Sequence, residues 1–137
     1  EAYPYDPAAA AWGMPASAAW VLERADLAAV AEVRRANYAA YAQALADVPG
    51  VSRMIPELPD SACPWGFPLL LPDRGRVDYL IRADGVPLFT FGEVLHPTLY
   101  EVHRGETRLL EQARRLADGV LGLAVHQDLA AEELARW

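Results

Sequence analysis

The sequence predicts an α+β domain in which helices cover a small mixed β-sheet, with a long helix ahead of the first strand. Three observations support this fold class. The first third of the chain carries a long amphipathic pattern, short apolar runs separated by turn residues follow Gly50, and helical and strand-like segments then alternate to the end. The 137 residues, of which 53% are hydrophobic, are enough for a single domain with its own core.

The N-terminal part is expected to start irregularly and then become helical. Residues 1–14 contain prolines and a glycine around an alanine run, and we interpret them as a lead-in to a domain over residues 15–137. Pro15 favours the first turn of a helix, so residues 16–24 are predicted to be helical. Apolar residues surround this lead-in and first helix on all sides, which indicates burial against another domain or subunit.

A second, longer helix is predicted from Asp26, whose side chain can cap its first turn, to about Val48, before a Pro-Gly turn. Arg34 falls in the middle of the apolar stripe of this helix. In one interpretation its stem packs in the core and its head reaches a carboxylate at the rim. In the other, Arg34 is a buried arginine that binds an anion.

Four short strands and three further helices are predicted after Gly50. The strands are expected over residues 51–55, 65–71, 86–91 and 122–126. The helices are expected over residues 74–84, 106–120 and 130–137. Residues expected to face inward from the first two helices are Val77, Leu80, Ile81, Leu109, Leu110, Ala113, Leu116, Ala117 and Val120. Pro68 has no N–H for a ladder, so its strand is expected at a sheet edge or a bulge.

The charged residues exclude several classes of function. The formal net charge of −7 argues against binding to nucleic acid or to an anionic membrane surface, because both interactions depend on cations. All twelve cationic side chains are arginines, so no side chain can form a Schiff base and no phosphate-binding P-loop exists. The single cysteine, Cys63, excludes an intrachain disulfide and is typical of a cytoplasmic protein.

Residues 92–105 form a long predicted loop, and long ordered loops in small domains are often functional. Four residues of this loop, Glu93, His96, Glu101 and His103, are of types that bind zinc, but their spacing fits no established zinc pattern. No metal site is therefore predicted. No serine lies in a Gly-x-Ser-x-Gly setting, so a nucleophilic triad is not predicted either.

His96 and Tyr100 are the most specific candidate pair in this loop. They are four residues apart with Pro97 between them, so one turn can present both side chains to a single cleft. A histidine there suits hydrogen bonding to sugar hydroxyls or to a carboxylate. The alternative is a surface histidine that only caps the backbone.

Five segments carry a resemblance to a known family. They are RRANY at residues 34–38, PWGFPLLLP at residues 64–72, HPTLY at residues 96–100, GLAVH at residues 122–126 and the closing segment at residues 129–137. In this order and spacing they resemble the small domain of the DegT/DnrJ/StrS family of PLP-dependent sugar aminotransferases.

The resemblance implies a C-terminal small domain with the fold seen in fold-type I PLP-dependent transferases. The full enzyme would move an amino group from glutamate or glutamine, through PLP, to a keto sugar carried on a nucleotide. A large domain upstream would supply the PLP lysine, and two copies would form a homodimer. This chain, without a catalytic or cofactor-binding residue of its own, would close one wall of the active-site cleft. Phe91, His96 and Tyr100 would bind the substrate, and Arg34 is the possible anion contact.

Two departures from the family keep other interpretations open. Members carry an Asn-Tyr-Arg segment before the long helix, where this chain has AWGMP at residues 11–15, and Ala124 replaces the proline of the family's SLPLH segment. A non-catalytic interaction or regulatory domain derived from such an enzyme is therefore the alternative function. An unrelated metal- or ligand-binding protein that uses His96 and His103 is a third interpretation.

Overall fold

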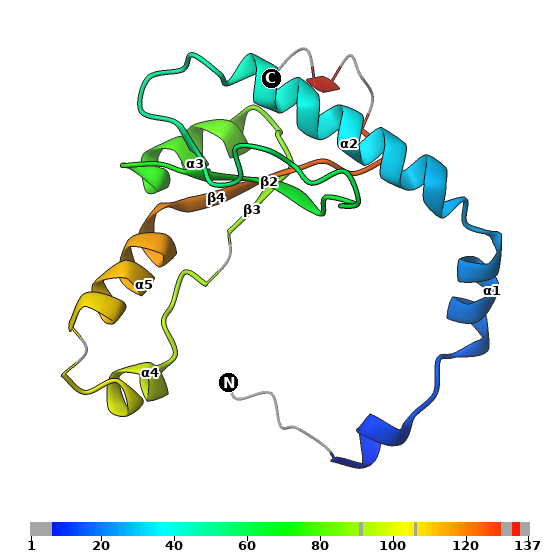
Figure 1. The fold of residues 1–137 in the computed structure, drawn as a ribbon, viewed down its shortest axis with the longest axis horizontal. Coiled ribbons are helices and arrows are strands. Elements are labelled where there is room, and N and C mark those ends of the chain that lie inside the picture. Colours follow the sequence, from blue (N-terminus) through cyan, green and yellow to red (C-terminus); the bar gives the residue numbers. More distant parts are fainter. Residues whose placement is uncertain (1–6, 91, 106, 130–132, 135–137) are drawn as a thin grey trace.

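The computed structural model describes residues 7–90, 92–105, 107–129 and 133–134, which combine a four-stranded sheet with helices (Figure 1). The elements before the second strand are η1 (Pro7–Ala11), α1 (Ala16–Arg24), α2 (Leu27–Ala44) and β1 (Ser52–Arg53). They are followed by β2 (Gly66–Leu70), α3 (Arg74–Ala83), β3 (Leu88–Phe89), α4 (Pro97–Val102), α5 (Thr107–Gly119) and β4 (Val120–Ala124).

The strands lie in the order β1-β2-β4-β3, and each neighbouring pair is antiparallel. The prediction of a mixed sheet is therefore wrong for the strands that the structure describes. β2 and β3 point the same way, because both are antiparallel to β4, but β4 lies between them. No parallel ladder forms among these strands. The order of helices and strands along the sequence does not show that β4 lies between β2 and β3, because tertiary contacts decide this.

β2 contains Pro68 but lies inside the sheet, so the expectation of an edge position is wrong. Leu71 N donates to Gly119 O at 2.9 Å, and the alternation of an antiparallel ladder then points the nitrogen of Pro68 toward β1. On that side Met54 N donates to the Pro68 carbonyl at 3.2 Å, just after β1 ends at Arg53. The missing N–H thus lies where β1 stops pairing, which explains why β1 is so short.

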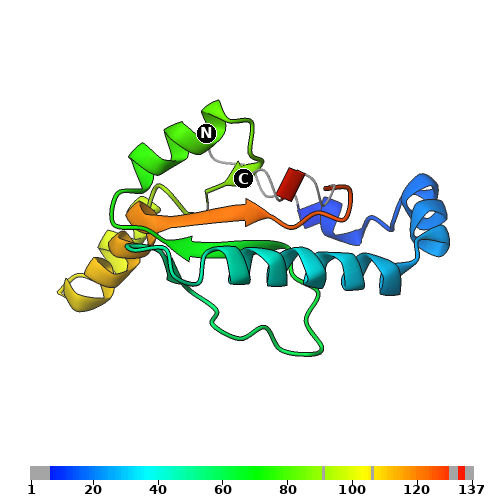
Figure 2. The same cartoon turned by 90° about the horizontal axis from the view of Figure 1, so that it is seen from above.

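One face of the sheet carries the core, and α2 runs along this face beside β2 (Figure 2). The core consists of Tyr38, Tyr41, Phe67, Leu69, Leu71, Leu121, Leu123 and Val125, with Val77 and Ile81 of α3 packed against it. Asn37 is buried at the edge of this core, where its Nδ2 donates to the carbonyls of Val125 and His126 at 3.4 and 3.0 Å. These bonds attach α2 to the end of β4.

The opposite face of the sheet carries two glycines, Gly66 of β2 and Gly122 of β4. The ring of Phe89 lies directly on Gly66 and Gly122, where a Cβ atom at either glycine would overlap it. Trp65 packs on Phe89 with 4.3 Å between the ring centroids, yet it remains 67% exposed. Glycine at both positions is therefore required by the close approach of an aromatic ring, and the outer side of Trp65 is open.

The helix starts predicted from the sequence are confirmed by their caps. Asp26 and Asp73 cap α2 and α3, since each Oδ1 accepts from the backbone N–H three residues ahead, at 3.0 and 3.3 Å. α2 ends at Ala44, one turn earlier than predicted, and Gly50, with φ of 82°, then turns the chain toward β1.

Several expectations about the second half of the chain need correction. Residues 97–102 form α4 inside the predicted loop, because six residues are too few to show a helical period. Leu80 and Leu116 were expected to face inward but are 53% and 44% exposed. The expected helix over residues 130–137 lies mostly outside the described residues.

Two arms project from the body, which consists of α2, α3 and the sheet. The N-terminal arm (residues 7–26) contains η1 and α1, and the α4–α5 arm comprises residues 92–105 and 107–119. Figure 1 shows the N-terminal arm continuing from the first turn of α2 and the α4–α5 arm at the other end of the body, and both extend below the sheet in this view while α2 lies above it. Exposed apolar residues of the N-terminal arm are Trp12, Met14, Trp20, Val21 and Leu22. Those of the α4–α5 arm are Val94, Leu99, Tyr100, Val102 and Leu116.

Candidate functional site

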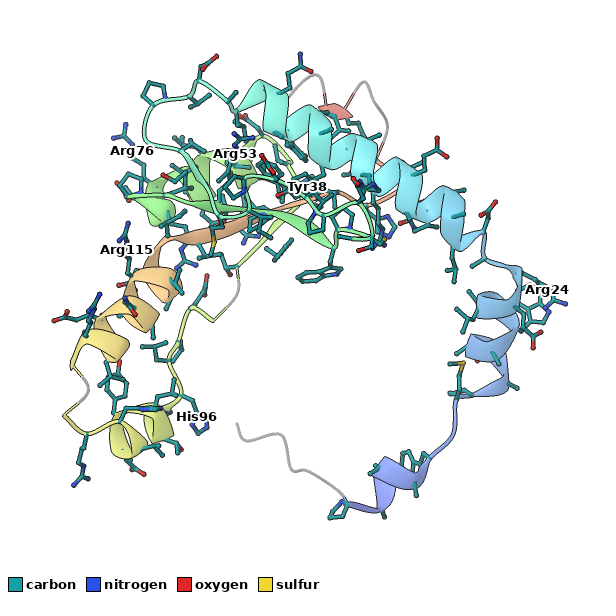
Figure 3. The ribbon with its side chains drawn as sticks, viewed as in Figure 1. Arg24, Tyr38, Arg53, Arg76, His96 and Arg115 are labelled. Carbon is teal, nitrogen blue, oxygen red and sulfur yellow. The ribbon has the colours of Figure 1, made fainter. Side chains whose placement is uncertain are left out.

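The α4–α5 arm holds two of the three predicted substrate-binding residues. His96 is the N-cap of α4, where its Nδ1 accepts from Thr98 N at 3.3 Å, and its side chain is exposed. Because Nδ1 accepts, the neutral ring carries its proton on Nε2, which is then a donor. Figure 3 shows His96 at the start of α4, away from the sheet. The residue therefore caps a helix and also presents an N–H to the outside.

Tyr100 lies on α4 one turn after His96 and is 41% exposed. Its hydroxyl accepts from Arg114 Nη2 of α5 at 3.3 Å, which connects the two helices of the arm. His96 is the N-cap of α4 and Tyr100 is its fourth residue, so the two residues lie about one turn apart. The sequence does not indicate Arg114 as a site residue, because it lies fourteen positions from Tyr100 and no local pattern links the two. Phe91, the third predicted substrate-binding residue, lies outside the described residues.

Glu93 holds the entry of the arm against the body. Its Oε1 lies 3.0 Å from Nη1 of Arg74, the first residue of α3, whose side chain is only 15% exposed. A hydrogen bond from Thr90, together with the charges of Arg74 and of the more distant Arg82, lowers the pKa of the Glu93 carboxyl below its ordinary value. The carboxylate is therefore stabilised in its charged form.

Arg34 lies on α2 in the body, and Figure 1 shows α2 and α4 in different parts of the molecule. It is half-buried, and its Nε donates to Oε1 of Gln127 at 2.9 Å. Its described partner is thus a neutral amide, where the two sequence interpretations expected a carboxylate or an anion. The structure does not bring Arg34 together with His96 and Tyr100.

An apolar groove of about 680 Å³ lies between α2, α3 and the core face of the sheet. Its lining includes Ala40, Tyr41, Leu69, Ile81 and Leu134. The Tyr41 hydroxyl is buried and has no hydrogen-bond partner among the described residues, and burial raises its pKa to about 12. The groove is thus mostly apolar, and its polar lining residues are Asn37, Tyr41 and Gln43.

Neither a metal centre nor a membrane span is found in the part of the chain that the structure describes. Within those residues, no three histidine, cysteine, aspartate or glutamate side chains lie close enough together to hold a metal ion. None of the described helices is both long and apolar enough to cross a membrane.

The comparison with known proteins rests on structure. No family model matches the sequence, and no curated protein matches it. Among solved structures, DesV of S. venezuelae in complex with a ketimine intermediate shares 25% identity with a TM-score of 0.71, over 88% of this chain and 33% of its own. The sugar aminotransferase CalS13 of Micromonospora echinospora shares 22% identity with a TM-score of 0.63, over 86% of this chain and 31% of its own.

A third match is a DegT DnrJ EryC1 StrS aminotransferase of Brucella abortus, which shares 20% identity with a TM-score of 0.58. It covers 88% of this chain and 31% of its own length. This chain thus spans about a third of the length of the solved structures that it matches. The resemblance carried by the five sequence segments is therefore confirmed in three dimensions: the chain has the fold of a partial domain of the DegT/DnrJ/StrS sugar aminotransferases.

Proposed function

We propose that this chain is the C-terminal small domain of a PLP-dependent aminotransferase that resembles the nucleotide-sugar aminotransferases. The observation that carries the proposal is the structural match, in which nearly the whole chain superimposes on a third of a known aminotransferase. A domain of this size is one third of such an enzyme, and the other two thirds would belong to a separate part of the enzyme that this chain does not include. The free, exposed Cys63 supports a cytoplasmic location for the whole protein.

The residues of this chain do not fit PLP on their own. PLP is held in such enzymes through an imine to a lysine, and this chain contains none. The cofactor and its lysine therefore belong to a separate large domain in this proposal. The part of this chain is to shape the substrate site and not to carry the reacting atoms.

The two arms are the surfaces that would contact the rest of the enzyme. Trp12 and Trp20 of the N-terminal arm are 77% and 57% exposed, and such a concentration of large apolar side chains marks an interaction surface. Both arms extend below the sheet in Figure 1, whereas α2 lies above it. We place the large domain and the partner subunit of a homodimer on that side, where the open sheet face with Trp65 also lies.

The α4–α5 arm would close one wall of the active-site cleft. Nε2 of His96 can donate to a sugar hydroxyl or to a phosphate oxygen of a nucleotide sugar, and Tyr100 presents a second polar group one turn away. Arg114, beside Tyr100, adds a positive charge that suits a diphosphate. The arm thus combines the polar groups needed to position such a substrate.

The test is a substitution at His96 that keeps the helix cap and removes the imidazole. The variant is made in the longer protein that contains this chain, and its activity is measured with nucleotide keto sugars. Asparagine is a good N-cap, so His96→Asn should keep the melting temperature and lower kcat/KM about tenfold, or ~1.4 kcal/mol. His126→Asn is the matched control, because His126 is an exposed histidine of the body. Equal activity of both variants would remove His96 from the substrate site, and absence of transamination in the unsubstituted protein would refute the enzyme itself.

A non-catalytic interaction or regulatory domain is the second candidate function. It is favoured by the AWGMP segment at residues 11–15, which lacks the asparagine expected to reach the cofactor phosphate of a partner subunit. The two candidates differ in the longer protein. A PLP enzyme shows an absorbance band that borohydride removes by trapping the cofactor on a lysine, whereas a regulatory domain shows neither.

A further inference from the structure

The two ends of the α4–α5 arm are attached to the body in different ways. At its exit, α5 runs directly into β4, and the carbonyl of Gly119 accepts from Leu71 N at 2.9 Å. The side chain of Leu70 also packs against Gly119. At its entry, residues 92–96 lie between β3 and α4 without belonging to a strand or a helix. The exit is therefore held by the sheet, and the entry needs another attachment.

The attachment to α3 is the ion pair between Glu93 of the arm and Arg74, beside the hydrogen bond that Glu93 accepts from Thr90. The two side chains meet at 3.0 Å, and the Arg74 side chain is 15% exposed while that of Glu93 is 50% exposed. Charge-assisted hydrogen bonds are stronger than neutral ones, and partial burial of one partner reduces the screening by water. Gly92, with φ of 70°, comes directly before Glu93 and allows the turn at this point.

The arm is also connected within itself. The bond from Arg114 of α5 to the Tyr100 hydroxyl of α4 joins its two helices at 3.3 Å. α4 carries both His96 and Tyr100, so a shift of its entry moves the two side chains together. Among the described residues, the arm is thus attached to the body at both ends, at the exit by the sheet and by Leu70 and at the entry by the Arg74–Glu93 pair.

We propose that Arg74 and Glu93 form a latch, a pair of positioning residues that holds α4 and thereby places His96 and Tyr100 in the substrate site. The proposal rests on the proposed function for its substrate, but the latch itself is a property of this chain. Neither residue touches the substrate in this scheme. Their effect passes through the entry segment to α4, and the lowered pKa of the Glu93 carboxyl agrees with a latch that is charged at neutral pH.

The first test measures the latch without any activity. In hydrogen–deuterium exchange of this chain, Arg74→Gln and Glu93→Gln should each raise the exchange rate of the α4 amides about three- to fivefold, while α2 and β4 stay unchanged. The double variant should be no faster than either single one, and the reversed pair Arg74→Glu with Glu93→Arg should slow α4 again.

Glu101→Gln is the matched control, since it removes a carboxylate from α4 itself without touching the latch. It should leave the exchange of α4 as in the original chain. Equal exchange of Glu93→Gln and the original chain would overturn the proposal. It would also be overturned if Glu93→Gln loosens α4 while Arg74→Gln does not, because Glu93 would then act through another partner.

The second test connects the latch to catalysis in the longer protein. Both latch variants should raise KM for the nucleotide sugar and lower kcat/KM about fivefold with an unchanged melting temperature, and the reversed pair should recover most of this loss. A loosened α4 with unchanged kinetics would overturn the positioning role. A loosened α4 in a protein that shows no transamination at all would instead refute the proposed function and leave the latch standing.

Discussion

The body of this domain and its two arms use apolar side chains in opposite ways. In the body, Phe67, Leu121 and Val125 are completely buried, whereas Trp12 and Trp20 of the N-terminal arm are 77% and 57% exposed. Burial of one large apolar side chain contributes ~1.5–3 kcal/mol, so the body accounts for the stability of the chain. The exposed apolar area of the arms is instead available for contacts with another domain or subunit. Substitutions in the body should thus change unfolding, and those in the arms should change association.

The largest expected effect is at the centre of the body. Phe67 is fully buried and packs against the rings of Tyr38 and Tyr41, with centroid distances of 4.6 and 5.7 Å. Phe67→Ala should lower the free energy of unfolding by about 3–5 kcal/mol, since it removes apolar area and leaves a cavity. Urea denaturation followed by circular dichroism measures this. An equal loss in Trp20→Ala, an aromatic truncation in the arm, would break the distinction between body and arms.

The second prediction tests the glycine face of the sheet. A Cβ at Gly122 would overlap the ring of Phe89, so Gly122→Ala should cost about 2 kcal/mol of unfolding free energy and displace that ring. A change in the fluorescence of Trp65, which packs on Phe89, should accompany the loss. Gly13→Ala is the control, because its Cβ would meet nothing within 4 Å. Similar costs at both glycines would show that backbone freedom, and not the aromatic contact, requires glycine at position 122.

The third prediction compares the two buried tyrosines of α2. The Tyr38 hydroxyl donates to the Ile55 carbonyl at 2.9 Å, while the buried Tyr41 hydroxyl finds no partner in the described part of the chain. Tyr38→Phe should therefore destabilise the chain by about 1 kcal/mol, and Tyr41→Phe should be neutral or slightly stabilising. Chemical denaturation at neutral pH distinguishes the two variants. A clear loss in Tyr41→Phe would contradict the absence of a partner for its hydroxyl.

The same pair gives a pH dependence. Burial raises the pKa of Tyr41 to about 12, above the ordinary value of about 10, because the folded chain disfavours the charged phenolate. The folded state therefore keeps the proton longer than the unfolded state. This contribution is fully present below about pH 10 and is lost as the pH rises toward 12. Tyr41→Phe should flatten the fall in stability over this range.

The smallest change in stability is expected in the N-terminal arm, where association should respond instead. Trp12→Ser combined with Trp20→Ser removes two exposed rings and should shift the free energy of unfolding by less than about 0.5 kcal/mol per site. If the arm is an interaction surface, the original chain should self-associate at high concentration and the double variant should not. Light scattering measures both. If the original chain is strictly monomeric at high concentration, the N-terminal arm is not an interaction surface.

The candidate site was only partly predictable. The sequence predicts that His96 and Tyr100 lie on one turn, and in the structure both lie at the start of α4. Their role in substrate binding stays a prediction. The helix itself was missed, because a six-residue helix with a proline at its start has no visible period. Arg114 was missed because its contact with Tyr100 depends on how α5 folds back beside α4.

The sequence by itself determined the features that arise from neighbouring residues. α1 follows from Pro15 just before its first turn. α2 and α3 follow from periodicity and from the caps Asp26 and Asp73, whose bonds span three residues. The sequence also determined that no side chain can form a Schiff base, since lysine is absent.

Only the tertiary structure decided what depends on residues far apart in the chain. In the folded chain β4 lies between β2 and β3, so the neighbouring strands of the described sheet are antiparallel although helices and strands alternate in the sequence. The tertiary structure placed Pro68 inside this sheet, with its nitrogen toward the short β1. It also paired Arg74 with Glu93 and Arg34 with Gln127. These contacts join segments whose separation along the chain leaves no local pattern, and packing of the whole domain selects them.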